Sequence, residues 1–175
     1  MDQRQLVLKP QDLLVAIKLA VNLRRDFLLA TLGQELGMVI SAVHGCVRRC
    51  ELARLISRSS GEMRAVKSTI LEFALHGARY AYPAVQGTLA RGMGTSIAGP
   101  SLRDHFDQTK APPPVWPDSS GNAYGPSITP LHHTVPMASR LDEKLFDVLT
   151  LIDALRVGAA REREMATELL KERLS

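Results

Sequence analysis

Apolar residues recur every three or four positions in three successive stretches near the start of the chain. This spacing is typical of one face of a helix, and it predicts helices over about 10–23, 26–36 and 40–54. Pro10 supports the first of these starts, because proline is tolerated in the first turn of a helix. Short apolar pieces on either side of a Ser-Ser-Gly turn then predict a β-hairpin over about 57–67. Three helices followed by a hairpin is the order in which a winged helix begins.

Within these stretches, residues 31–50 have the spacing of a helix-turn-helix. Gly37 stands where the chain must turn sharply between the second and third predicted helices. Gly33 comes four residues earlier, where two crossing helices approach closely, and Val43 comes six residues later, where it can fill the seam. Such a unit commonly places its second helix in the major groove of DNA.

The rest of the chain divides into two stretches of different composition. Residues 83–136 hold nine of the ten prolines and six of the twelve glycines, which predicts a long irregular segment. Helical spacing of apolar residues then resumes. We therefore expect a mainly α fold with a small β-wing: a winged helix-turn-helix domain over 1–82, a Pro/Gly-rich segment over 83–137 on its surface or against a partner, and a helical region over 138–175.

The positive charge is concentrated in the half that contains the helix-turn-helix. The net charge is +4, and residues 1–80 contain 12 Lys and Arg against 7 Asp and Glu, whereas residues 81–175 contain 10 against 11. A local basic excess favours a polyanionic partner, because cationic side chains release the counterions condensed on phosphates. No apolar run is long enough for a membrane span, so we expect a cytoplasmic protein without membrane contact.

Few residues suggest metal or catalytic chemistry. Cys46 and Cys50 lie four apart in the third predicted helix, where we expect them to be reduced core residues. His132 and His133 form an isolated pair, and the glycines of 92–97 lack the third glycine and the acidic residue of a dinucleotide-binding fingerprint. No serine, histidine and acid have the spacing of a catalytic set. We therefore expect no metal, no cofactor and no enzymatic activity.

The third predicted helix, at about 40–54, is the candidate recognition helix. Its apolar positions define an inward face, which leaves six residues outward: Ser41, Ala42, His44, Gly45, Arg48 and Arg49. Residues in the first turns of such a helix reach base edges, and later basic residues contact phosphates. We assign the first four to the bases and the two arginines mainly to the backbone. The predicted wing adds three cations: Arg58, Arg64 and Lys67.

The stretch GMVISAVHGCVRR, residues 37–49, resembles the Gly-Met-Ser-x-Ser-x-Val core of bacterial winged-helix transcriptional regulators, broadly the MarR-like group. The resemblance covers roughly residues 10–80. It implies a dimeric regulator with the second helix in the major groove of double-stranded DNA and the wing along the minor groove. One departure is Val39, which stands where a helix-capping Ser or Thr is usual. Valine cannot accept a hydrogen bond from the free amides, a loss of roughly 1 kcal/mol.

Two functional hypotheses follow. The first is a sequence-specific DNA-binding transcriptional regulator that forms a homodimer through the helices of 141–174. The alternative is an antitoxin-like or adaptor interaction protein whose winged helix is structural and whose segment 83–136 binds a protein partner. In that segment Val115 and Trp116 follow three prolines. An extended proline-rich stretch loses little entropy on docking, and tryptophan is a strong anchor, so these two residues are the candidate partner contact.

Overall fold

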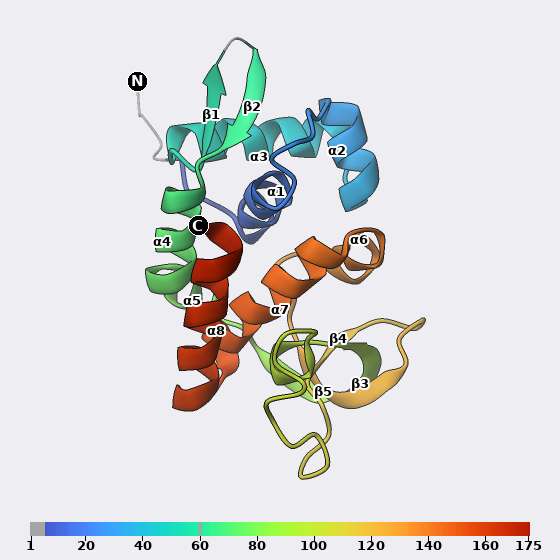
Figure 1. Ribbon diagram of the computed structural model, residues 1–175. Coiled ribbons are helices and arrows are strands. Elements are labelled where there is room, and N and C mark those ends of the chain that lie inside the picture. Colours follow the sequence, from blue (N-terminus) through green and yellow to red (C-terminus); the bar gives the residue numbers. More distant parts are fainter. Residues whose placement is uncertain (1–5, 60) are drawn as a thin grey trace.

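The computed structural model describes residues 6–59 and 61–175, which form a mixed α/β structure in which helices predominate (Figure 1). In chain order the elements of this part are α1 (Pro10–Ala20), α2 (Leu29–Leu36), α3 (Ile40–Leu52), β1 (Ile56–Ser59), β2 (Glu62–Ala65), α4 (Lys67–His76), α5 (Ala78–Ala81), β3 (Gln86–Gly94), η1 (Ser96–Ala98), β4 (Val115–Pro117), β5 (Ala123–Ile128), α6 (Val135–Leu141), α7 (Glu143–Val157) and α8 (Ala160–Leu174). The three predicted N-terminal helices and the hairpin are present. None of the helices in the described ranges combines the length and apolarity needed to cross a membrane.

Helix α1 is the central helix of the N-terminal half. Every residue from Asp12 to Ala20 is buried, and α1 packs against α3, β2, α4 and α7. Its buried ammonium group, on Lys18, has two carboxylate partners: Asp142 at 2.6 Å and Glu35 at 2.7 Å. Because Glu35 belongs to α2 and Asp142 caps α7, this cluster joins α1 and α2 to a helix that is distant from them in the sequence.

The turn between α2 and α3 has the predicted geometry. Gly37 adopts a left-handed conformation with a φ of 64°, which glycine accepts without strain. A Cβ atom on Gly37 would also meet the flexible end of Met137 in α6, which would have to move to make room for it. A Cβ atom on Gly33 would lie 2.6 Å from the carbonyl oxygen of Met38 and 3.5 Å from Val43. The close approach of the two helices is therefore confirmed.

The prediction of a long irregular segment after residue 83 is wrong in part. Strand β3 pairs antiparallel with β4 and β5, and the three strands close on one another. Three of the glycines that suggested irregularity lie where two backbones approach closely: Gly92, Gly121 and Gly125. A Cβ atom on Gly92 would lie 2.0 Å from the carbonyl oxygen of Trp116, and one on Gly125 would lie 1.9 Å from that of Pro113. These glycines therefore allow close strand packing.

The C-terminal helices belong to the same core as the N-terminal ones. Helix α7 packs against α1, α5, α6, α8 and η1, and its apolar residues from Leu145 to Leu155 are almost all buried. One hydrophobic cluster contains residues from α1 through α8, so the predicted boundaries at 82 and 137 do not separate independent cores. The apolar stripe of α7 is covered by this core. A dimer through the helices of 141–174 stays a prediction, and it would have to use their other faces.

Candidate nucleic-acid interface

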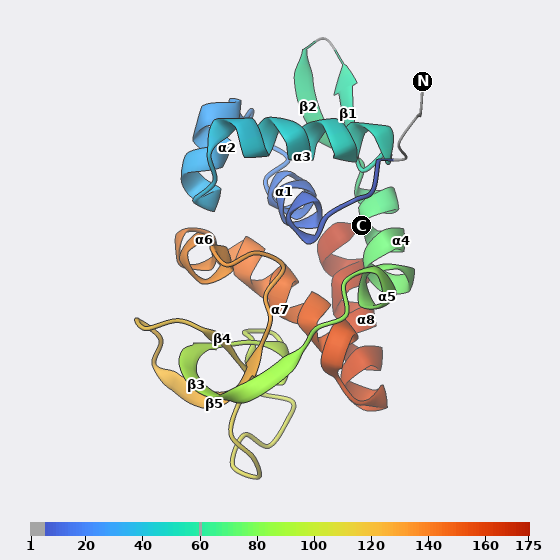
Figure 2. The same ribbon diagram turned by 180° about the vertical axis from the view of Figure 1, so that it is seen from behind.

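Helix α3 lies across one side of the molecule, with one long face open to solvent (Figure 2). Its inward face consists of the four residues predicted from the spacing, and all are buried: Val43, Cys46, Val47 and Cys50. The opposite face exposes five residues: Ile40, Ser41, His44, Arg48 and Leu52. Since residues four apart lie on the same face of a helix, these side chains form a continuous outer row along α3.

The four residues predicted to face DNA bases divide into two pairs. Ser41 and His44 are exposed and lie in the outer row, whereas Ala42 and Gly45 lie at its flanks and are only partly exposed. A Cβ atom on Gly45 would lie 3.3 Å from the Nη1 atom of Arg49. Glycine at this position therefore leaves space for the Arg49 side chain, in addition to keeping this flank of the helix flat.

The two neighbouring arginines of α3 have different surroundings. Arg49 donates from Nε and Nη2 to the two carboxylate oxygens of Asp12, each at 2.7 Å, and Asp12 is fully buried. The hydrogen bonds to this carboxylate raise the pKa of Arg49 above its usual value. Arg48 is exposed, and no ion pair joins it to another residue in the described part of the chain. The guanidinium group of Arg49 therefore holds α3 onto α1. Its assignment to the DNA backbone stays a prediction, and this pairing does not favour it.

The hairpin of β1 and β2 projects beyond the helices next to α3 (Figures 1 and 2). Four residue pairs join its strands, from Ile56 with Ala65 to Ser59 with Glu62. Arg58 lies on β1 and forms an ion pair of 2.8 Å with Glu51 of α3. The hairpin is thus connected to the outer side of the helix.

The other two predicted wing cations also have partners in the same chain. Arg64 forms ion pairs with Glu62 at 2.6 Å and with Asp26 at 3.1 Å, and the hydrogen bond to Glu62 raises the pKa of Arg64. Lys67 donates to the backbone carbonyl of Ser175. The carboxylates beside Arg58 and Arg64 neutralise much of the positive charge that the sequence places on the hairpin.

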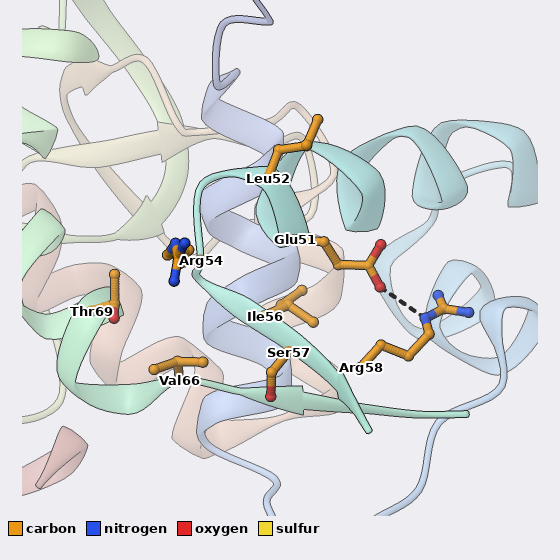
Figure 3. Close-up of a pocket in the computed structure, with 8 residues that line it drawn as sticks. All are labelled: Glu51, Leu52, Arg54, Ile56, Ser57, Arg58, Val66 and Thr69. Carbon is orange, nitrogen blue, oxygen red and sulfur yellow. Dashed lines mark hydrogen bonds and ion pairs between the residues drawn. The ribbon is translucent and has the colours of Figure 1, made fainter. Parts of the chain in front are cut away.

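An open groove of about 820 Å³ separates the end of α3 from the hairpin and the start of α4. It is lined by eight residues (Figure 3): Glu51, Leu52, Arg54, Ile56, Ser57, Arg58, Val66 and Thr69. Figure 3 places Arg54 away from the Glu51–Arg58 pair. Arg54 has a φ of 61° and lies beyond α3, which ends at Leu52 rather than at the predicted position 54. The periodicity of the sequence gave no signal that Arg54 leaves the helix and turns into this groove.

The predicted partner contact is wrong, because both of its residues are buried. Trp116 is only 1% exposed and Val115 is fully covered. The Nε1 atom of Trp116 donates a hydrogen bond of 2.6 Å to Asp153 of α7. This tryptophan therefore packs inside its own protein, where it joins the small sheet to the helical core.

The two cysteines have surroundings that suppress their reactivity. Both thiols are buried. Burial, together with the neighbouring Asp12 carboxylate, raises the pKa of the Cys46 thiol to about 11, and burial raises the pKa of Cys50 further. In the described residues no group of three His, Cys, Asp or Glu side chains has the arrangement of a metal site.

Comparisons with known proteins identified no relative of this chain. No protein-family model, curated protein or solved structure matches this chain. The outer row of α3 and the hairpin beside it are therefore the features from which a function can be inferred.

Proposed function

We propose that this protein is a cytoplasmic regulator of transcription that binds double-stranded DNA, with α3 in the major groove and the β1–β2 hairpin against the adjacent backbone. The observation that carries the proposal is the outer row of α3, which is open to solvent next to a projecting hairpin. This arrangement is the one implied by the resemblance of residues 37–49 to MarR-like winged-helix regulators.

The dimensions and side chains of α3 suit this role. The helix has 13 residues, which gives a length of roughly 20 Å at about 1.5 Å per residue, and the major groove admits one α-helix. Ser41 and His44 can both donate and accept hydrogen bonds at base edges. Arg48 comes one turn later in the same row, where a cation meets a phosphate.

The partnered cations of the hairpin remain available to DNA. The ion pairs of Arg58 and Arg64 are solvent-exposed, and exposed pairs contribute only about 0–1 kcal/mol. A phosphate can therefore replace the carboxylate at little energetic expense. The pair between Arg49 and Asp12 differs, because Asp12 is buried and would lose its main counterion.

A homodimer is part of the proposal, since two-fold symmetry would present two copies of α3 to successive half-sites. The apolar stripe of α7 is covered, so the dimer contact must use other surfaces. Light scattering with and without DNA tests this point, and a monomer under both conditions would contradict the dimer.

Fluorescence anisotropy with a labelled 24-base-pair duplex, titrated at several salt concentrations, tests DNA binding. The probe is the tightest-bound sequence selected from a randomised pool. We expect Arg48→Ala to weaken binding and to reduce the salt slope by about one, the effect of losing one phosphate contact. The matched control is Arg161→Ala, which removes an exposed arginine from α8 and should leave both quantities unchanged. Equal binding by wild type and Arg48→Ala would contradict the assignment of α3.

One observation favours the adaptor alternative. On the outward side of the small sheet, Leu89 is paired with Pro126 and Arg91 with Tyr124. Leu89 and Tyr124 are both largely exposed, so this sheet face offers apolar surface to a protein partner. In this alternative the 83–136 segment would bind its partner through Leu89 and Tyr124, and not through the buried Trp116. A complex that survives high salt and is lost in Tyr124→Ser would support it, because phosphate-driven binding weakens steeply with salt.

A further inference from the structure

Two apolar side chains stand at the exposed start of α3. Val39 is 71% exposed and Ile40 is 54% exposed. Val39 is the residue that caps the helix, and it makes no side-chain hydrogen bond to the free amides. A serine, threonine, aspartate or asparagine there would stabilise the helix by accepting a hydrogen bond from a free amide. The chain thus has apolar surface at a position where a polar residue would favour folding.

This apolar pair is continuous with the groups assigned to DNA. Ile40 and His44 are one helical turn apart in the outer row, and Arg48 follows one turn later. The first turn of α3 contains no acidic residue, so no negative charge there opposes a nucleic acid. Apolar contact at the start of the row and a cation further along it complement a base edge and the neighbouring phosphate.

The groups that bases present in the major groove indicate which base Val39 and Ile40 could contact. Base edges there present hydrogen-bond donors and acceptors, and the apolar group among them is the C5-methyl of thymine. The first residues of a recognition helix are those that contact base edges. The side chains of Val39 and Ile40 can bury such a methyl group, and they cannot hydrogen-bond to the polar edges of guanine, cytosine or adenine.

We infer that α3 recognises thymine through its methyl group, with Val39 and Ile40 as the residues that contact it. This inference rests on the proposed function and adds the sequence class that the protein selects: sites with thymines where the start of α3 enters the groove. Ser41 and His44 then contact the polar edges of the neighbouring base pairs.

Deoxyuridine tests this directly, because it pairs as thymidine does and lacks only the methyl group. The selected 24-base-pair duplex is synthesised with thymidine or with deoxyuridine throughout, and the Kd of each is measured by anisotropy. We expect the wild type to bind the deoxyuridine duplex about fourfold more weakly for each methyl group contacted, the equivalent of one buried apolar carbon. The double variant Val39→Ser with Ile40→Ser should bind both duplexes equally. The matched control is Leu141→Ser, since Leu141 is a 62% exposed leucine on α6, and this variant should discriminate as the wild type does.

The outcomes separate this inference from the proposal on which it rests. Equal wild-type affinity for the two duplexes, with binding still weakened by Arg48→Ala, would overturn thymine recognition and leave DNA binding in place. No binding to any duplex would overturn both. Loss of self-association in the Val39→Ser, Ile40→Ser variant, measured by light scattering, would also overturn the inference, because these side chains would then be buried between two copies of the chain. Circular dichroism of each variant verifies that it is folded.

Discussion

Helix α3 and the small sheet of β3, β4 and β5 place their polar groups on opposite sides. In α3, His44 and Arg48 face the solvent. At the sheet, the indole N–H of Trp116 and the hydroxyl of Thr95 point inward, where Asp153 accepts hydrogen bonds from them at 2.6 Å and 2.9 Å. The polar side chains of the two regions therefore do different things. Those in the outer row of α3 contribute little to the fold and are available for binding, whereas Trp116 and Thr95 attach the sheet region to α7.

Among the substitutions that test this difference, the replacement of Trp116 should change the stability most. We expect Trp116→Ala to lower the free energy of unfolding by about 3–5 kcal/mol, because it opens a cavity and deprives the buried Asp153 of a donor. Urea denaturation measures the change. The matched control is Tyr124→Ala, which removes a 62% exposed ring from the outer sheet face and should change the stability by less than about 0.5 kcal/mol. A Trp116→Ala protein that is as stable as wild type would show that the sheet is not held by this contact.

The replacement of Arg49 should have the next largest effect on stability. It also distinguishes the role of Arg49 from that of its neighbour Arg48. We expect Arg49→Ala to destabilise the protein by about 3 kcal/mol, because it leaves the Asp12 carboxylate buried without its counterion. Arg48→Ala should change the stability by less than about 0.5 kcal/mol while weakening DNA binding. Thermal and urea unfolding of the two variants measure the difference. Equal destabilisation by both substitutions would mean that the inner and outer sides of α3 are not distinct in this way.

The stability of the helices on which α3 packs should also depend on pH, through the ionisation of Asp142. Burial opposes ionisation of Asp142, but hydrogen bonds from Lys18, Asn22 and the Leu145 amide outweigh it and lower the pKa of this carboxyl. A lowered pKa contributes stability above the unfolded value of about 3.9, and that stability is lost as the pH falls through the folded value. We expect Asp142→Asn to destabilise the protein by about 2 kcal/mol at neutral pH, with the difference shrinking below about pH 4.

Urea denaturation between pH 3 and 7 measures this dependence. Asp104 serves as the control, because its side chain is 86% exposed, and the Asp104→Asn curve should run parallel to that of the wild type. A constant gap between Asp142→Asn and wild type across this range would contradict an ionised Asp142 in the folded protein.

The smallest expected effect concerns Tyr82, which lies in the core. Burial raises the pKa of Tyr82, so the hydroxyl stays protonated, and that hydroxyl has no hydrogen-bond partner among the described residues. A buried hydroxyl without a partner is unfavourable, so we expect Tyr82→Phe to be neutral or to stabilise the protein by up to about 1 kcal/mol. A clear loss of stability in urea denaturation would mean that the hydroxyl is hydrogen-bonded and that the core contains a further polar link.

The sequence predicted α3 well and the sheet poorly, for one physical reason. Helical periodicity is local, so the inward positions of α3 and the turn at Gly37 could be identified from residues a few places apart. Strand pairing joins residues that are distant in the chain, such as Met93 with Trp116. The glycines and prolines between them have the same composition in an irregular loop as in a tightly crossed sheet.

The same limit explains why the sequence could not separate Arg49 from Arg48. Periodicity places Arg48 and Arg49 on adjacent parts of the helix surface, and both are cations. What distinguishes them is Asp12, which is 37 residues away in another helix and is buried by the fold. For the same reason the sequence could not identify Asp153 as the partner of Trp116. Exposure of Val39 and Ile40 likewise became clear only once the neighbouring helices were in place.

The ion pair between Lys18 and Asp142 has a consequence for the order in which the protein matures. These residues are 124 positions apart, so a ribosome synthesises the whole of α2, α3, the hairpin and the sheet before the second carboxylate partner of Lys18 exists. Until α7 emerges, α1 lacks one of the surfaces that cover it, and α3 rests on an incomplete base. A nascent chain should therefore acquire the proposed DNA affinity only after the C-terminal helices have been made, which would keep an unfinished polypeptide from occupying a DNA site.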